Sequence, residues 1–349
     1  MTLTDLGVPA LRISRPAPTA GPLIDTFGRI ATDLRVSLTD RCNLRCTYCM
    51  PAEGLDWLPG SQLLSAAELS RLLRIGITRL GITNVRFTGG EPLVSRNLEE
   101  IIAAAAALRP RPQIAMTTNG IGLAARAAGL KQAGLDRVNV SLDTVDATHF
   151  AQITRRDRLD DVLAGLAGAA AAGLAPVKVN AVLDPRTGLD DVVPLLRFCL
   201  EHEYQLRIIE QMPLDAGHEW SRDRAIGADA VLDTLRRYFD LRPDPAPRGS
   251  APAALWRVDG SAATVGIIAS VSEAFCGACD RTRLTADGQI RNCLFSTAET
   301  DLRGLLRGGA GDDEIETAWR QAMWAKAAGH GINDPSFVQP SRPMSAIGG

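Results

Sequence analysis

The segment DLRVSLTDRCNLRCTYCMP, residues 33–51, joins an alternating apolar run to a loop that carries three cysteines. The alternation over residues 33–38 predicts a β-strand, and Cys42, Cys46 and Cys49 follow it with the spacing C-x3-C-x2-C. A structural zinc site takes four tetrahedral ligands, and this loop contains no histidine that could supply the fourth. A four-iron cluster takes one thiolate per iron. The three cysteines therefore predict a 4Fe–4S cluster with one iron left open for another ligand.

The strand at residues 33–38 is the first of six short β-branched runs, which are separated by Ala- and Leu-rich segments with helical spacing. Strands are predicted at residues 33–38, 83–88, 112–117, 136–141, 176–183 and 205–210. Helices are predicted near residues 65–80, 97–108, 122–133, 159–173 and 189–202. This alternation predicts an α/β fold with a parallel sheet, which buries both faces whether it closes into a barrel or stays open.

Polar sequences collect where these strands end. RFTGGEP ends the second strand, TTNG the third, NVSLD the fourth and IIEQM the sixth, and the fifth strand carries Lys178. Any one of these turns is explained by an ordinary loop. Parallel sheets, however, bind their ligands at the carboxyl ends of the strands, so several polar turns at one edge indicate a functional rim.

The βα rhythm divides the 349-residue chain into four parts. Residues 1–30 contain four prolines and are predicted to be a flexible leader, and residues 31–212 form the barrel. Residues 213–335 are interpreted as an extension that closes one side of it, with strands near 255–258 and 263–268 and helices near 299–308 and 312–328. Residues 242–254 are Pro-rich and predict a surface excursion away from the site. The tail, residues 336–349, has a composition typical of disorder.

Charge and hydropathy exclude several classes of function. The net charge of -2 and the pI near 6.1 give no overall field for nucleic acid or for an anionic membrane. The sequence contains no run of about 18 apolar residues, so no membrane span is predicted, and its N-terminus lacks the pattern of an export signal. We therefore expect a cytoplasmic protein with reduced cysteines. Cys199, on an apolar helical stretch, is expected to be buried.

Three further cysteines, Cys276, Cys279 and Cys293, have the spacing C-x2-C-x13-C. A zinc ribbon that lacks one visible ligand is the alternative here. A second iron–sulfur cluster with an open iron is favoured, because the set again has three thiols. The sequence RTR follows directly after the second of these cysteines.

The motif CNLRCTYC resembles the signature of the radical S-adenosylmethionine (SAM) superfamily. Within this superfamily, the chain resembles the GTP 3′,8-cyclase (MoaA) family through a series of motifs in the same order. They are DLRVSLTDRCNLRCTYCMP, VRFTGGEPL, TTNG, GLDRVNVSLDT, VKVNAV, the second cysteine trio with RTR, and a closing IGG. The resemblance covers most of the chain. It implies an incomplete (βα)6 radical SAM barrel with a C-terminal extension that carries a second cluster.

The resemblance also implies roles for individual residues. Cys42, Cys46 and Cys49 hold the cluster that binds SAM, and Cys276, Cys279 and Cys293 hold the cluster that binds GTP. The implied SAM contacts are Tyr48, Gly90, Ser141 and Met212, although Met212 alone would equally fit core packing. The implied GTP contacts are Arg35, Arg86, Thr117, Lys178, Arg281, Thr282 and Arg283. The tail glycines Gly348 and Gly349 are implied to reach the active site and to be needed for cyclisation.

The implied reaction is that of a lyase in molybdenum cofactor biosynthesis. A 5′-deoxyadenosyl radical removes the C3′ hydrogen of GTP, the resulting carbon radical adds to guanine C8, and reduction then gives 3′,8-cyclo-7,8-dihydro-GTP. The implied partners are cyclic pyranopterin monophosphate synthase downstream, an electron donor and a second copy in a homodimer. Two alternatives stay open: another radical SAM enzyme with an auxiliary cluster that modifies a peptide or cofactor, and a zinc or iron–sulfur binding module.

Overall fold

The computed structural model describes residues 16–335 and 337–348. Six parallel strands form its centre, and each lies within two residues of its predicted bounds. They pair in chain order. Their bounds are β1 (Asp33–Ser37), β2 (Asn84–Thr88), β3 (Gln113–Thr118), β4 (Arg137–Ser141), β5 (Lys178–Val182) and β6 (Gln205–Ile209). The prediction of a parallel α/β sheet is confirmed.

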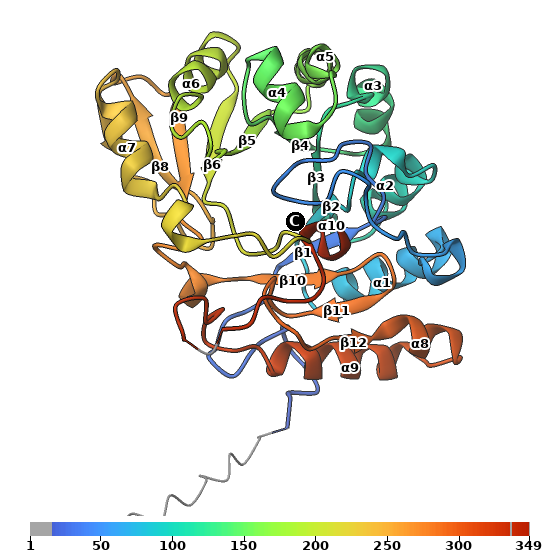
Figure 1. Ribbon diagram of the computed structural model, residues 1–349. Coiled ribbons are helices and arrows are strands. Elements are labelled where there is room, and N and C mark those ends of the chain that lie inside the picture. The colour runs from blue at the N-terminus through green and yellow to red at the C-terminus, as the bar shows by residue number, and fades with distance from the viewer. Residues whose placement is uncertain (1–15, 336, 349) are drawn as a thin grey trace, which may run out of the picture.

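Helices cover the outer side of this curved sheet (Figure 1). Five match the predicted segments: α1 (Ala66–Thr78), α2 (Leu98–Ala106), α3 (Leu123–Ala133), α5 (Leu159–Ala171) and α6 (Val192–Glu201). The start of α1 could be predicted from the sequence because Ser65 and Glu68 form a reciprocal capping box there. A short helix, α4 (Ala147–Thr154), precedes α5 between β4 and β5 and was not predicted.

The C-terminal extension differs from the expectation of a one-sided addition, because it continues the sheet at both edges. Beside β1 lie β10 (Arg281–Leu284), β11 (Gln289–Arg291) and β12 (Thr300–Asp301); beside β6 lie β9 (Thr264–Ile268), β8 (Ala254–Val258) and β7 (Leu241–Pro243). Three helices, α7 (Ala228–Arg236), α8 (Leu302–Arg307) and α9 (Asp312–Trp324), belong to the extension. β10 and β9 run parallel to their central neighbours. The twelve-stranded sheet is open, with β12 and β7 as its edges.

The core fills the space between the sheet and the helices. Phe87 and Leu34 in the strands are fully buried, as is Trp319 of α9. Helices α3 and α5 approach closely because Gly168 of α5 has no side chain; a Cβ there would lie 2.8 Å from the Cα of Ala124 in α3. Among the described residues, no helix has the length and apolar character needed to cross a bilayer.

Part of the predicted leader is packed against the barrel. Residues 1–15 lie outside the described residues, but Leu23 and Ala31 are fully buried, and Asp25 and Arg29 are 1% and 9% exposed. Arg29 forms a 2.5 Å ion pair with Asp25. The expectation of a flexible segment therefore does not hold for residues 23–30, because its apolar and paired polar side chains complete the core beside β1.

Candidate active site

A cavity of about 490 Å³ lies inside the curve of the sheet. All six cysteines of the two trios line it, and none of them forms a disulfide. Cys199 lies instead in the core and is 1% exposed, as predicted. Further predicted site residues that line the cavity are Tyr48, Gly90, Ser141, Met212, Arg35, Arg86, Thr117, Lys178, Arg281 and Arg283. The topology therefore brings together residues as far apart in the chain as Arg35 and Cys293.

The GGEP turn after β2 holds the first cysteine loop through its backbone. Gly90 donates its N–H to the carbonyl oxygen of Thr39 at 2.7 Å, and Glu91 donates to that of Arg41 at 2.8 Å. A Cβ at Gly90 would lie 2.3 Å from the Arg41 oxygen, so no other residue fits without a shift. From the sequence, the glycines of this turn are expected to let the backbone approach a ligand. The structure shows that they also allow close contact with the loop that carries the cysteines.

Glu91 joins two strand-end turns and was not singled out from the sequence. It is 1% exposed, and its carboxylate accepts hydrogen bonds from the Thr118 hydroxyl and the Asn119 N–H, both at 2.7 Å. Asn119 in turn donates to Asn43 at 2.6 Å and lies 3.8 Å from the Cys42 sulfur. Burial raises the pKa of Glu91 to about 7. This chain of bonds orients the first cysteine loop from the ends of β2 and β3.

Tyr48 and Asp143 form a second link to the same loop. The Tyr48 hydroxyl donates to Asp143 at 2.7 Å, and Asp143 also accepts from the N–H of Val182 at 2.9 Å. Burial raises the pKa of Asp143 to about 6. Tyr48 is thus fixed at the ends of β4 and β5, close to Ser141. Asp143 could have been found in the sequence because it ends the motif NVSLD.

The second cysteine trio lies among cations. Arg29 donates to the carbonyl oxygen of Cys276 at 2.8 Å and to that of Ala328 at 2.8 Å. The Lys326 ammonium is 3.3 Å from the Cys279 sulfur and donates to the Arg281 carbonyl oxygen at 2.8 Å. The segment before β1 and the chain after α9 therefore both position this loop.

Three arginines form a row across adjacent strands. The register places Arg35 of β1 opposite Arg86 of β2 and opposite Arg283 of β10, and all three line the cavity. Asp33 pairs with Arg35 at 3.0 Å, whereas the buried Nε of Arg86 has no partner in the described chain. Burial and then the charge of Arg35 lower the pKa of Arg86 well below its usual value. Buried cations require an anion, so this row can bind one.

Two more cations, Lys178 on β5 and Arg207 on β6, line the cavity outside this row. Burial and then Arg207 lower the pKa of Lys178 to about 8. Arg207 lies on β6, is 6% exposed and lines the cavity, but it was not predicted as a site residue. The signal was present in QLRIIE, because a charged residue inside an apolar strand needs a partner, as for Arg35 and Arg86. Burial and then Arg35 lower the pKa of Arg283 to about 9.

Two sequence expectations need correction here. The side chain of Thr282 does not face the cavity, because side chains alternate along β10; its hydroxyl accepts a 3.2 Å hydrogen bond from Trp319 on the opposite face. The Pro-rich segment was expected to lie away from the site. Instead, Ala251 and Pro252 line the cavity, and Arg281 donates to the Ser250 carbonyl oxygen at 2.6 Å.

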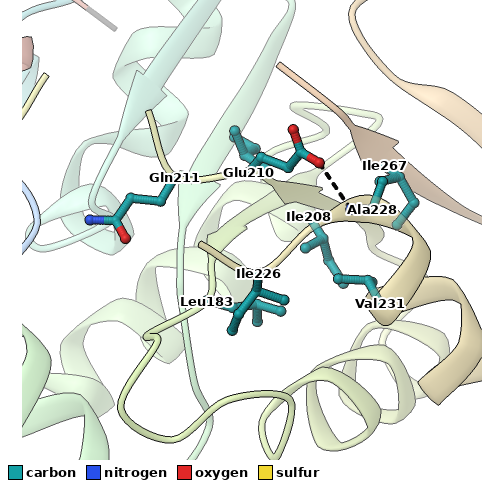
Figure 2. Close-up of a pocket in the computed structure, with 9 residues that line it drawn as sticks. Leu183, Ile208, Glu210, Gln211, Ile226, Ala228, Val231 and Ile267 are labelled. Carbon is teal, nitrogen blue, oxygen red and sulfur yellow. Dashed lines mark hydrogen bonds between the residues drawn. The ribbon is translucent and has the colours of Figure 1, made fainter. Parts of the chain in front are cut away.

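The end of β6 is held by a buried glutamate that the sequence analysis did not identify. Figure 2 shows the Glu210 carboxylate directed at the start of α7, where it accepts from the N–H of Ala228 at 2.9 Å. The same carboxylate accepts from the N–H groups of Val271 and Ser272 at 2.8 and 2.9 Å. Glu210 thereby joins the segment with Met212 to the loop that leads to the second cysteine trio.

The C-terminal tail enters the curve of the sheet, where Figure 1 shows α10 (Met344–Ile347) beside β1 and β2. Arg283 donates to the Gly348 carbonyl oxygen at 2.5 Å. Gly348 has a φ of 82°, and a Cβ there would lie 2.5 Å from the Thr88 hydroxyl oxygen. Only glycine fits this position without a shift. Gly349 lies outside the described residues.

The residues present fit two iron–sulfur clusters. Each trio offers three free thiols to one cavity, with backbone or cationic donors near the sulfurs; the Leu44 N–H, for example, donates to the Cys42 sulfur at 3.4 Å. In the described parts of the chain, no three His, Cys, Asp or Glu side chains are arranged to hold a single metal ion. In a four-iron cluster each thiolate binds a different iron, so the thiols need not converge on one point.

Solved structures with a similar fold include Streptococcus suis SuiB bound to its precursor peptide SuiA, with a TM-score of 0.54, 15% identity and coverage of 88% of this chain and 67% of that chain. SuiB bound to S-adenosylmethionine gives a TM-score of 0.53 at 14% identity, covering 78% of this chain and 63% of that chain. At these identities the likeness concerns the fold alone.

Family models and curated relatives give a closer match. The model of the Radical SAM superfamily matches residues 36–199, and the model of Molybdenum Cofactor Synthesis C matches residues 204–332. The GTP 3′,8-cyclase of Mycobacterium sp. (strain KMS) is 78% identical over 352 residues, and that of Mycobacterium marinum is 73% identical over 360 residues. Both alignments cover 100% of each chain. The chain therefore belongs to the GTP 3′,8-cyclase family of radical SAM proteins.

Proposed function

We propose that this chain is a lyase that converts GTP to 3′,8-cyclo-7,8-dihydro-GTP, the first step of molybdenum cofactor biosynthesis. One observation carries the proposal. Two cysteine trios and a row of buried arginines face a single cavity, so a cofactor on one trio and a nucleotide on the other would lie close together. Family membership supports the reaction, and this arrangement supports binding of the two reactants side by side.

The first trio, Cys42, Cys46 and Cys49, would hold a 4Fe–4S cluster and, with it, SAM. When bound, this cofactor pair supplies the 5′-deoxyadenosyl radical. The GGEP turn with Gly90 and the Tyr48 hydroxyl orient the cysteine loop, and Ser141 and Met212 line the same cavity. These residues form the SAM side of the site.

The second trio, Cys276, Cys279 and Cys293, holds a second 4Fe–4S cluster that binds the guanine of GTP. The triphosphate is held by the cations that line the cavity, which are Arg35, Arg86, Lys178, Arg207, Arg281 and Arg283, with Thr117 nearby. A triphosphate matches this set because guanidinium groups bind phosphate oxygens in a bidentate way. The C3′ radical left by loss of the C3′ hydrogen would then add to guanine C8, and one electron from the donor with one proton would complete the 7,8-dihydro product.

The tail glycines complete the site for cyclisation. Gly348 is placed against β1 and β2 and receives a hydrogen bond from Arg283, a member of the row. We expect deletion of Gly348 and Gly349 to leave iron content and SAM binding intact and to abolish the cyclised product. A deletion variant with unchanged product formation would rule out this role.

The decisive test is anaerobic incubation of the reconstituted protein with SAM, a strong reductant and GTP. The expected products are 5′-deoxyadenosine and a cyclised nucleotide in equal amounts. Cleavage of SAM without consumption of GTP would instead assign the chain to the radical SAM enzymes that modify a peptide or another cofactor.

The proposed function also implies partner proteins. Its product passes to cyclic pyranopterin monophosphate synthase, a one-electron donor reduces the first cluster, and the active form is a homodimer. Co-purification with the synthase and sedimentation of the reconstituted protein test these partners.

A further inference from the structure

Lys326, two residues after the end of α9, is a buried lysine that is only 4% exposed. Its ammonium donates to the carbonyl oxygen of Arg281 at 2.8 Å, and it lies 3.3 Å from the sulfur and 3.5 Å from the carbonyl oxygen of Cys279. None of these three acceptors, which all lie within the described residues, belongs to a carboxylate. Lys326 therefore holds a positive charge in the interior of the protein, beside the second cysteine trio.

The Cys279 sulfur is the one acceptor of Lys326 that can carry a negative charge. The two carbonyl oxygens are neutral, whereas a buried ammonium requires an anion. A cysteine binds iron as a thiolate, and a 4Fe–4S cluster gains a further negative charge when it is reduced. A cluster on the second trio would therefore supply the counter-charge that Lys326 requires.

Packing on both sides of Lys326 fixes the place of its ammonium. Trp319 and Met323 of α9 are fully buried, and the Lys326 N–H donates to the Met323 carbonyl oxygen at 3.0 Å. Two residues further on, the carbonyl oxygen of Ala328 accepts the 2.8 Å hydrogen bond from Arg29. The short distance from the ammonium to the sulfur is thus a property of the packed chain and not of a free side chain.

Arg281 is a second cation near the same sulfur. Its Nη1 lies 3.7 Å from the sulfur of Cys279, but its guanidinium also donates to the carbonyl oxygen of Ser250 at 2.6 Å and lies 4.0 Å from Asp280. Arg281 therefore shares its charge with a carboxylate. Lys326 lies closer to the sulfur and is the stronger donor to it.

We propose that Lys326 donates a hydrogen bond from its ammonium to the Cys279 sulfur of the bound second cluster and thereby raises the reduction potential of that cluster. Hydrogen bonds to cluster sulfurs and the charge near them are among the factors that determine this potential. The reduced cluster carries one more negative charge than the oxidised cluster, so the cation stabilises the reduced form more. The inference rests on the second trio as a cluster site, as in the proposed function, but not on cyclisation of GTP.

The first test compares the full-length protein with two variants after anaerobic reconstitution. Lys326→Met keeps the length of the side chain and removes its charge and its donors. The control, Lys131→Met, removes an exposed ammonium that binds the carbonyl oxygen of Gly173. Redox titration followed by electron paramagnetic resonance, without GTP, gives the midpoint potential of the cluster whose signal does not change on addition of SAM. We expect a negative shift for Lys326→Met and none for Lys131→Met, and equal potentials in all three proteins would overturn the proposal.

A second test leaves Lys326 in place, and so covers the case in which Lys326→Met fails to retain the second cluster. The chain contains only three lysines, Lys131, Lys178 and Lys326, which makes labelling with ¹⁵N-lysine selective. Pulsed electron paramagnetic resonance of the reduced second cluster should then show a weak coupling to ¹⁵N. We expect the same coupling in labelled Lys178→Arg. Absence of the coupling in labelled wild-type protein, or its loss in Lys178→Arg, would overturn the proposal.

Failure of this inference and failure of the proposed function can be told apart. Protein that shows the ¹⁵N coupling and the shift in potential but does not cyclise GTP would refute the proposed function and leave this inference standing. Protein that cyclises GTP but shows neither the coupling nor the shift would refute the role of Lys326 alone.

Discussion

The two cysteine trios are built in different ways. The first lies in one loop, at Cys42, Cys46 and Cys49, and is held by hydrogen bonds from the ends of neighbouring strands. The second is assembled from the chain before β10 and after β11, and is held by side chains from the N-terminal segment and from the end of α9. The first is thus a local structure on a rigid rim, whereas the second exists only when distant segments have packed.

The charges around the two trios also differ. Burial raises the pKa of Cys46 well above the ordinary thiol value, and the nearby Asp143 adds to this rise. At Cys279 burial acts in the same direction, but Lys326 and Arg281 bring the pKa below the ordinary value. The surroundings of Cys46 therefore disfavour its thiolate, whereas those of Cys279 favour it; at Cys276, in the same trio as Cys279, burial again raises the pKa. The comparison shows that two equal ligand sets can be given different chemistry by their neighbours.

The largest expected effect on activity comes from variants that remove one cluster at a time and so distinguish the roles of the two trios. Cys46→Ala should abolish both SAM cleavage and cyclisation, because the first cluster is lost. Cys279→Ala should retain SAM cleavage and lose the cyclised product, because only the second cluster is affected. Each variant should lose about four irons per chain. Iron analysis and chromatography of the products measure this, and loss of SAM cleavage in both variants would contradict the division.

Arg29→Ala tests whether the second trio depends on the N-terminal segment. The change leaves Asp25 buried without its partner, which should lower the free energy of unfolding by about 3–5 kcal/mol. Iron at the second site should fall while the first site keeps its cluster. The control is Arg158→Ala, which removes an exposed ion pair with Asp161 and should leave the stability nearly unchanged, because water and salt screen such pairs. Equal iron loss at both sites would argue against a local effect.

Arg342→Ala tests whether an ion pair holds the C-terminal tail in the site. Arg342 binds both oxygens of Asp287, at the turn between β10 and β11, with distances of 3.0 and 2.8 Å. Charged hydrogen bonds of this kind contribute about 1.5–3 kcal/mol, so carboxypeptidase should digest the variant tail roughly tenfold to a hundredfold faster. Arg236→Ala, which removes an exposed pair with Asp233, is the control. Unchanged digestion would show that apolar packing of the buried Ile347 alone holds the tail.

The smallest effect concerns the pH dependence of GTP binding. The pKa of Lys178 is lowered to about 8, so in the free protein this side chain loses its positive charge as the pH rises through about 8. A bound triphosphate favours the charged form, and the KM for GTP should therefore rise severalfold between about pH 7 and about pH 9. Lys178→Arg should give a flatter profile because arginine stays charged. The same slope in both proteins would assign the effect to another group.

Much of the fold could be predicted because strands and helices are specified largely by residues near one another in the sequence. The six central strands and five of the helices follow from alternation, helical spacing and caps such as Ser65 with Glu68. The positions of β10 and β9 beside β1 and β6 could not be predicted, because strand pairing depends on packing between segments far apart in the chain. For the same reason Arg29 and Glu210 were missed, since each acts through partners that only the folded chain brings near.

By itself the sequence determined the donor chemistry of the site: two sets of three thiols, strand-end glycines, and cations inside apolar strands whose burial requires an anion. Tertiary structure alone decided which way each side chain faces, so that Thr282 points to Trp319 while Arg281 and Arg283 point to the cavity. It also decided that a tail of disordered composition is folded between the two trios. Ligand type is a property of single residues, whereas orientation and burial depend on the packing of the whole chain.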